Sequence, residues 1–154
     1  MQKTKVMFVC HGNICRSPMA EFIFKDMLEK QGLSHLFEVA SSAVSFEEIG
    51  NPVYPPARDM LSSHGISCQG KRAVHFEYED YLENDYILVM DSSNMRNILR
   101  ITKGENDGRI KRLLEYTGEN SDVSDPWYSR DFTTAYSDIY RGCEGLLNHI
   151  KTKK

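Results

Sequence analysis

The feature that most constrains this chain is a short segment near its start, residues 6–18. Residues 6–9 are all apolar and predict a buried strand. A turn follows over residues 10–16. Pro18 then marks the start of a predicted helix over residues 19–30, because proline is favoured in the first helical turn. A strand that leads through a tight loop into a helix directs backbone N–H groups into one concavity, where they can bind an anion.

Two side chains add reactivity to this predicted anion-binding loop. Cys10 supplies a thiol, and loop N–H groups with a helix N-terminus lower a cysteine pKa from about 8.5 toward about 3.5–7.5, which creates a nucleophile. Arg16 can hold two phosphoryl oxygens through its planar guanidinium, where the charge of phosphoryl transfer develops. Gly12 and Asn13 tolerate left-handed backbone angles. The hydroxyl of Ser17 could hydrogen-bond the sulfur and make it a better leaving group.

The same residues also allow simpler interpretations. A cysteine at the end of a strand is often a small buried hydrophobe. Cys10 and Cys15 could belong to a metal site, but structural zinc sites have closer spacing and two further ligands nearby. Within the loop, we expect Asn13 to hold the backbone shape and His11 to point outward. The phosphate-binding loop is the favoured interpretation.

Length and charge limit the classes of protein to which the chain can belong. Its 154 residues predict one domain over residues 1–154. A net charge of −3 gives no basic field for nucleic acid or a membrane surface, and four scattered cysteines do not indicate a disulfide framework. The first apolar run is too short for a signal peptide or a bilayer span. We therefore expect a cytoplasmic monomer with no nucleic-acid or membrane partner.

Strands and helices are predicted to alternate along the chain. The expected strands are residues 37–43, 86–90 and 110–116 after the first one, and the expected helices after the first are residues 57–64, 94–102 and 132–151, with loops over 46–56 and 118–130. The alternation predicts an α/β fold: a single-domain three-layer sandwich, with a four-stranded parallel sheet and helices on both faces. Ligands bind beyond the carboxyl ends of such strands, where the loops that carry the motifs should converge.

A second chemical motif is Asp125-Pro126-Trp127-Tyr128. A phenolate is a poor leaving group, because the pKa of tyrosine is about 10, and a carboxylic acid beside the bridging oxygen would remove that difficulty. Asp125 could protonate the leaving group and then activate water, with its direction fixed by Pro126. Trp127 and Tyr128 could form the wall of a slot for a flat ring. An isolated Asp-Pro pair, however, is usually only a turn.

Together these motifs resemble the low-molecular-weight protein tyrosine phosphatases. Residues 10–18 carry the resemblance, and residues 49–52, 64–66, 85–91 and 125–128 extend it over almost the whole chain. The resemblance implies a hydrolase that needs no metal or cofactor and cleaves phosphotyrosine and other aryl phosphate monoesters through a phosphocysteine. Cys10 would be the nucleophile, Arg16 the phosphate clamp and Asp125 the general acid and base. Phosphotyrosine-containing proteins would be the substrates, and inorganic phosphate the product and an inhibitor.

The other predicted site residues bind the substrate. They are His11, Gly12, Asn13, Ile14, Cys15, Ser17, Phe46, Trp127 and Tyr128. Phe46 is included because relatives often place a tyrosine or tryptophan shortly before the segment at 49–52, and Glu47 beside it could bias substrate choice. Lys71 stands where many relatives have a histidine, which puts in doubt any bracing bond between a serine and that histidine.

Several points stay open on the sequence alone. Asp91 is either a helix cap or part of the loop's support, and Cys15 is either a packing residue or the partner of Cys10 in a protective disulfide. An arsenate reductase would share the fold and the loop, but it needs further cysteines placed to carry a disulfide outward. A catalytically silent phosphoprotein-binding module would have little use for both Cys10 and Asp125. Activity on phosphoserine or phosphoarginine is not decided by the sequence.

Overall fold

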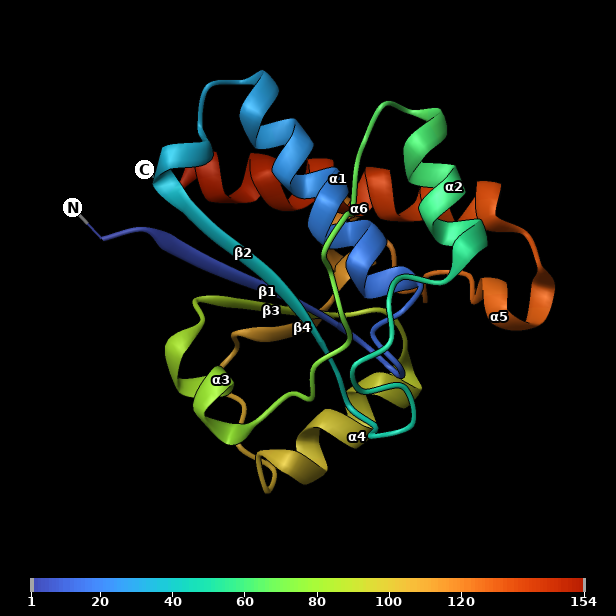
Figure 1. Cartoon of the computed structure of the whole chain (residues 1–154). Helices are drawn as coiled ribbons and strands as arrows, with labels where there is room; N and C mark the ends of the chain where they lie inside the picture. The colour runs from blue at the N-terminus through green and yellow to red at the C-terminus, as the bar shows by residue number, and fades with distance from the viewer. Residues whose placement is uncertain (1, 154) are drawn as a thin grey trace.

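The computed structural model describes residues 2–153 and contains a four-stranded parallel sheet with helices on both faces (Figure 1). The strands are β1 (Thr4–Cys10), β2 (Phe37–Ala43), β3 (Tyr86–Val89) and β4 (Ile110–Arg112). Their spatial order is β2-β1-β3-β4, and each neighbouring pair is parallel. The predicted fold class is therefore confirmed.

The helices divide into two layers (Figure 1). One layer holds α1 (Arg16–Lys30), α2 (Pro55–Ser63) and α6 (Phe132–Thr152), and the other holds α3 (Tyr78–Glu83) and α4 (Ser92–Ile101). Alternate residues of a strand point to opposite faces of the sheet. Val6 and Phe8 accordingly belong to the core under α1 and α6, whereas Met7 and Val9 pack in the second core with residues of α3 and α4.

The segment over residues 110–116 differs most from its predicted form. The expected strand at 110–116 ends at Arg112, and a 3-10 helix, η2 (Leu113–Thr117), takes the remainder. Leu113 and Leu114 are buried in the core with residues of α6 rather than paired in the sheet. The prediction failed because a short apolar run does not distinguish a strand from a helical turn.

Two further boundaries bear on the site. The helix expected from residue 19 begins at Arg16, so the first loop passes directly into α1. The loop expected over 118–130 contains a one-turn helix, α5 (Pro126–Ser129), with Asp125 as its N-cap. A second 3-10 helix, η1 (Ser34–Leu36), connects α1 to β2. None of the helices within residues 2–153 combines the length and the apolar character that crossing a membrane requires.

The carboxyl ends of three strands meet where the site forms. In the sheet register, Cys10 lies beside Ala43 of β2, and Val9 lies beside Val89 of β3. The chain leaves β1 toward one layer of helices and leaves β3 toward the other, so the loop after β1 lies at the switch point of the sheet. Ligands of open parallel sheets bind at such a switch point.

Candidate active site

The loop at residues 10–16 wraps around the sulfur of Cys10. The backbone N–H of Asn13 donates to Cys10 Sγ over 3.3 Å, and Ser17 Oγ lies 3.0 Å from the same atom. The sulfur also lies next to the N-terminus of α1, which begins at Arg16. Unpaired N–H groups and the positive end of the helix dipole at such a position stabilise negative charge. The loop can therefore stabilise an anion on the sulfur or an anion bound above it.

Asn13 supports this loop through buried hydrogen bonds. Its φ angle is 59°, in the left-handed region that asparagine tolerates better than most residues. Its amide nitrogen donates to Ser17 Oγ (2.7 Å) and to Ser41 Oγ (3.0 Å), and its amide oxygen accepts from the backbone N–H of Val74 (3.1 Å). Asn13 is fully buried by these contacts, so it holds the loop in shape, as expected.

Arg16 is held in a fixed position by two hydrogen bonds. Nη1 donates to the carbonyl of Val123 (3.0 Å), and Nη2 donates to Asp91 Oδ2 (2.8 Å). Burial acts to lower the pKa of Arg16, but negative charge on Cys10, Asp91 and Asp125 outweighs it, so the pKa lies above its ordinary value. Guanidinium has five N–H donors, so several remain for a ligand.

Asp91 performs both of the roles left open on the sequence. One carboxylate oxygen accepts from the backbone N–H of Asn94 (2.7 Å) and caps α4. The other oxygen accepts from Arg16. The same side chain therefore starts a helix and orients the guanidinium.

Asp125 approaches the same guanidinium nitrogen of Arg16 as Asp91 does. Its Oδ1 accepts from the backbone N–H of Trp127 (3.0 Å) as the N-cap of α5, and its Oδ2 lies 3.5 Å from Nη2 of Arg16. Pro126 occupies the first turn of α5, where its missing N–H has no consequence. The side chain is one-third exposed, so it can exchange protons with a ligand or with water.

One cavity of about 460 Å³ joins these groups. Of the predicted site residues, the cavity is lined by Cys10, His11, Gly12, Ile14, Cys15, Arg16, Asp125, Trp127 and Tyr128. Trp127 and Tyr128 are 43% and 83% exposed, and they stand at the open side. The structure therefore brings together the thiol, the guanidinium, the carboxylate and two aromatic rings.

Three predicted substrate-binding residues do not line the cavity. Asn13 and Ser17 are buried beneath the loop, where they bond to one another and to the sulfur. Phe46 lies outside, because its ring stacks on His75 with centroids 3.8 Å apart. The neighbouring Glu47 lines the cavity instead and bonds to His11 (3.1 Å).

Several residues that line the cavity are not indicated by the sequence. These are Glu48 and the α4 residues Ser93, Asn94 and Asn97. The first turn of α4 could have been expected at the site, because α4 follows β3 at the same edge of the sheet as Cys10. Nothing in the local sequence around Glu48 indicates its position.

Cys15 differs from Cys10 in its surroundings. Burial is the largest cause that raises the pKa of Cys15 to about 12, and the nearby Cys10 raises it as well. Cys15 therefore remains a thiol at neutral pH. The disulfide between Cys10 and Cys15 stays a prediction. Among residues 2–153, no group of three or more His, Cys, Asp or Glu side chains is placed to bind a metal ion.

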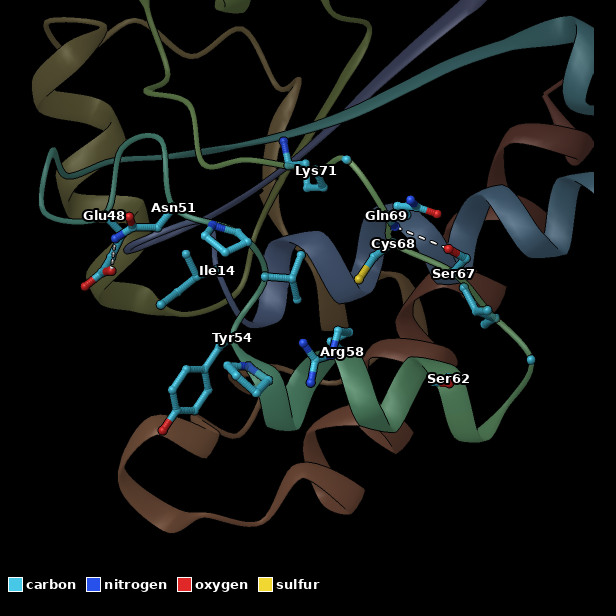
Figure 2. Close-up of a pocket in the computed structure, with 16 residues that line it drawn as sticks. Ile14, Glu48, Asn51, Tyr54, Arg58, Ser62, Ser67, Cys68, Gln69 and Lys71 are labelled. Carbon is cyan, nitrogen blue, oxygen red and sulfur yellow. Dashed lines mark hydrogen bonds between the residues drawn. The ribbon is translucent and has the colours of Figure 1, made fainter.

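A second and larger cavity has a volume of about 770 Å³. Ile14 and Glu48 line both cavities. The second cavity extends between α2 and the following loop, where Cys68 and Lys71 lie (Figure 2).

The profile of the family described as low molecular weight phosphotyrosine protein phosphatase matches residues 5–154. The chain is 39% identical over 151 residues to the low molecular weight protein-tyrosine-phosphatase YfkJ of Bacillus subtilis, covering 97% of both chains. It is 37% identical over 146 residues to PtpA of Staphylococcus aureus, covering 94% of this chain and 92% of the other.

Solved structures agree with these sequence matches. The crystal structure of YfkJ superposes with a TM-score of 0.96 at 38% identity, covering 100% of this chain and 98% of the other. The low molecular weight protein tyrosine phosphatase SP-PTP of Streptococcus pyogenes superposes with a TM-score of 0.85 at 35% identity, covering 95% and 92%.

Proposed function

The chain belongs to the low molecular weight phosphotyrosine protein phosphatases, which are hydrolases, and from that premise we propose that it cleaves phosphotyrosine and other aryl phosphate monoesters through a phosphocysteine. The observation that carries the proposal is the shared cavity: the Cys10 thiol, the Arg16 guanidinium and the Asp125 carboxyl line one space of about 460 Å³. These are a nucleophile, an anion clamp and a proton donor.

In the first step, the sulfur of Cys10 attacks the phosphorus atom as a thiolate, having already given its proton to solvent. The loop N–H groups and Arg16 bind the three equatorial oxygens, where charge is concentrated in the transition state. Arg16 is already held by Val123 and Asp91, so it needs no rearrangement as that charge develops. The S–P bond forms, the P–O bond to the aryl group breaks, and protonated Asp125 gives its proton to the leaving oxygen.

In the second step, water replaces the sulfur. The Asp125 carboxylate removes a proton from the water molecule, the water oxygen bonds to phosphorus, and the S–P bond breaks. The hydroxyl of Ser17, 3.0 Å from the sulfur, stabilises the departing thiolate. Inorganic phosphate leaves as the product and competes with substrate for the same donors.

The walls of the cavity favour an aryl ester. Trp127 follows Asp125 on α5 and lies against Tyr54, with ring centroids 5.0 Å apart. Tyr128 also lines the cavity and is 83% exposed. Exposed aromatic rings beside a phosphate site provide a stacking surface for a phenyl ring, which phosphoserine lacks.

The test is steady-state kinetics on peptides that differ only in the phosphorylated residue: phosphotyrosine, phosphoserine and phosphoarginine. We expect phosphotyrosine to be cleaved with the largest kcat/KM and Cys10→Ser to abolish turnover while phosphotyrosine binding remains. Cleavage that survives alkylation of Cys10, or a preference for phosphoserine, would overturn the proposal. Thioredoxin-dependent arsenate reduction faster than phosphate release would favour an arsenate reductase instead.

A further inference from the structure

Arg130 adopts a backbone conformation that arginine disfavours. It is the C-cap residue of α5, with φ 62° and ψ 11°, in the left-handed region where a Cβ atom crowds the following carbonyl oxygen. Glycine, which has no Cβ, is the residue that usually ends a helix in this conformation. Strained positions persist where other interactions hold them, and they are frequent at functional sites. In this chain the interactions that offset the strain come from the Arg130 side chain.

The side chain of Arg130 connects two elements that are distant in the sequence. Its Nη1 donates to the hydroxyl oxygen of Tyr54 over 3.0 Å, across 76 positions of the chain. Tyr54 is the N-cap residue of α2, so the bond ties the end of α5 to the beginning of α2. In Figure 2 the hydroxyl of Tyr54 points away from α2, toward the faint orange ribbon of the α5 segment. We call this contact the Arg130–Tyr54 bridge.

Both residues of the Arg130–Tyr54 bridge contact Trp127. The Tyr54 ring packs against the Trp127 ring with centroids 5.0 Å apart and an angle of 53° between the planes. The guanidinium carbon of Arg130 lies over the Trp127 ring, 5.9 Å from its centroid, which is a favourable cation–π distance. Tyr54 is itself supported by Phe132, with ring centroids 6.2 Å apart. Trp127 is therefore held on two sides although 43% of it is exposed.

This support is needed because α5 cannot fix Trp127 by itself. The helix has only four residues, and a helix of one turn is not stable alone. Trp127 lines the smaller cavity beside Asp125, whereas Tyr54 lines the larger one. A side chain that is mobile before binding must be ordered by each ligand, which weakens binding, whereas a side chain that is already ordered avoids this loss.

On the premise of the proposed function, we propose that the Arg130–Tyr54 bridge holds Trp127 in place as the wall against which the aryl ring of the substrate stacks. Arg130 does not line the cavity of the described chain, so it is a positioning residue that acts through Trp127. Glycine would fit the backbone at this position, but it could reach neither Tyr54 nor Trp127. The bridge thereby strengthens the binding of phosphates that carry an aromatic ring and leaves the binding of the phosphoryl group itself unchanged.

Four variants separate the side chain from the strain. Arg130→Ala removes the bridge and keeps the strained backbone, Arg130→Gly removes both, and Tyr54→Phe removes only the hydroxyl group. The matched control is Lys103→Gly. Lys103 follows α4 with φ 56° and, within the described part of the chain, lines neither cavity, so Lys103→Gly relieves a similar strain without touching the bridge.

The first readout is the fluorescence of Trp127, which is the only tryptophan in the chain. We expect Arg130→Ala, Arg130→Gly and Tyr54→Phe to lower its anisotropy. Quenching by acrylamide should increase in these variants by up to about twofold, since 43% of Trp127 is exposed already. Lys103→Gly should match the wild type. Adding Tyr54→Phe to Arg130→Ala should change little further, because the bond between them is already lost.

The second readout compares two ligands by calorimetric titration, so it does not depend on turnover. Inorganic phosphate contacts the loop alone, and phenylphosphonate adds an aromatic ring. In Arg130→Ala the Kd of phenylphosphonate should rise about 3- to 10-fold, the value of one aromatic contact, while the Kd of phosphate stays unchanged. The KM for a phosphotyrosine peptide should rise by a similar factor, with a smaller change in kcat.

Unchanged anisotropy and quenching in Arg130→Ala would overturn the proposal, and so would equal weakening of phosphate and phenylphosphonate. Arg130→Gly should melt about 2–4 °C above Arg130→Ala, and equal melting would refute the argument from strain. If Arg130→Ala does not fold, Tyr54→Phe and Arg130→Gly decide the outcome. A wild-type protein that binds phenylphosphonate but does not cleave phosphotyrosine would refute the proposed function, while the fluorescence would still test the bridge by itself.

Discussion

Replacing Asp125 by asparagine removes the proposed proton donor and keeps the local structure. Asparagine caps helices as well as aspartate does, so the bond from the Trp127 N–H to the side-chain oxygen, 3.0 Å in the structure, should persist. General acid catalysis is worth about 10²- to 10⁴-fold, or about 2.7–5.5 kcal/mol of activation free energy. We therefore expect kcat/KM for phenyl phosphate to fall by that factor, with a change in folding stability of only a few tenths of a kcal/mol.

The assay is a series of aryl phosphates whose leaving groups range from acidic nitrophenols to phenol. An ester with an acidic leaving group needs no proton, so Asp125→Asn should slow its first step far less than that of phenyl phosphate. Asp131→Asn is the matched control, because Asp131 caps α6 through the N–H of Thr134 (2.9 Å) and does not line the cavity. Equal slowing of all the esters by Asp125→Asn would refute the assignment of the acid.

Four further predictions concern the loop, one helix and the second cysteine. Asn13→Ala should destabilise the protein by about 4 kcal/mol in urea unfolding, because three buried hydrogen bonds are lost at about 1 kcal/mol each and alanine adopts φ 59° at a cost of about 1 kcal/mol. Gly145→Ala should lower the melting temperature, although alanine ordinarily stabilises a helix interior, because its Cβ would collide with the carbonyl oxygen of Tyr116. At pH 8, iodoacetamide should label Cys10 and spare Cys15, since a pKa of about 12 leaves about one thiolate in 10⁴. The folded state also keeps the Cys15 proton between pH 9 and 12 while the unfolded state loses it, so stability should fall as the pH rises through that range, and less steeply in Cys15→Ala.

The sequence was informative where function depends on unusual residues at close spacing. That Cys10, Arg16 and Asp125 line one cavity could be predicted, because a thiol and a guanidinium in the loop after a strand and an Asp-Pro pair in a later loop have a joint chemical use at the carboxyl edge of a parallel sheet. The parallel sheet could be predicted because strands and helices alternate along the chain, and because the apolar runs at residues 6–9 and 86–90 indicate strands buried on both faces.

Features that depend on tertiary placement could not be predicted. Phe46 is expected at the site because of its position in the chain, but a loop has no periodicity that fixes its direction, and its ring stacks on His75. Glu21 has the sequence context of a surface residue on a helix. It is buried because Ser41 and Lys71, which are distant in the sequence, supply its partners. Such pairings become visible only in the folded chain.

The most direct test of the central claim is to trap the covalent intermediate. Asp125→Asn, mixed rapidly with a nitrophenyl phosphate, should release the nitrophenol in a burst and then stall, because the activation of water also depends on Asp125. Mass spectrometry of the quenched protein should find one phosphoryl group, on the peptide that contains Cys10. A burst with the phosphoryl group on another residue, or steady turnover with no phosphorylated Cys10, would contradict the mechanism.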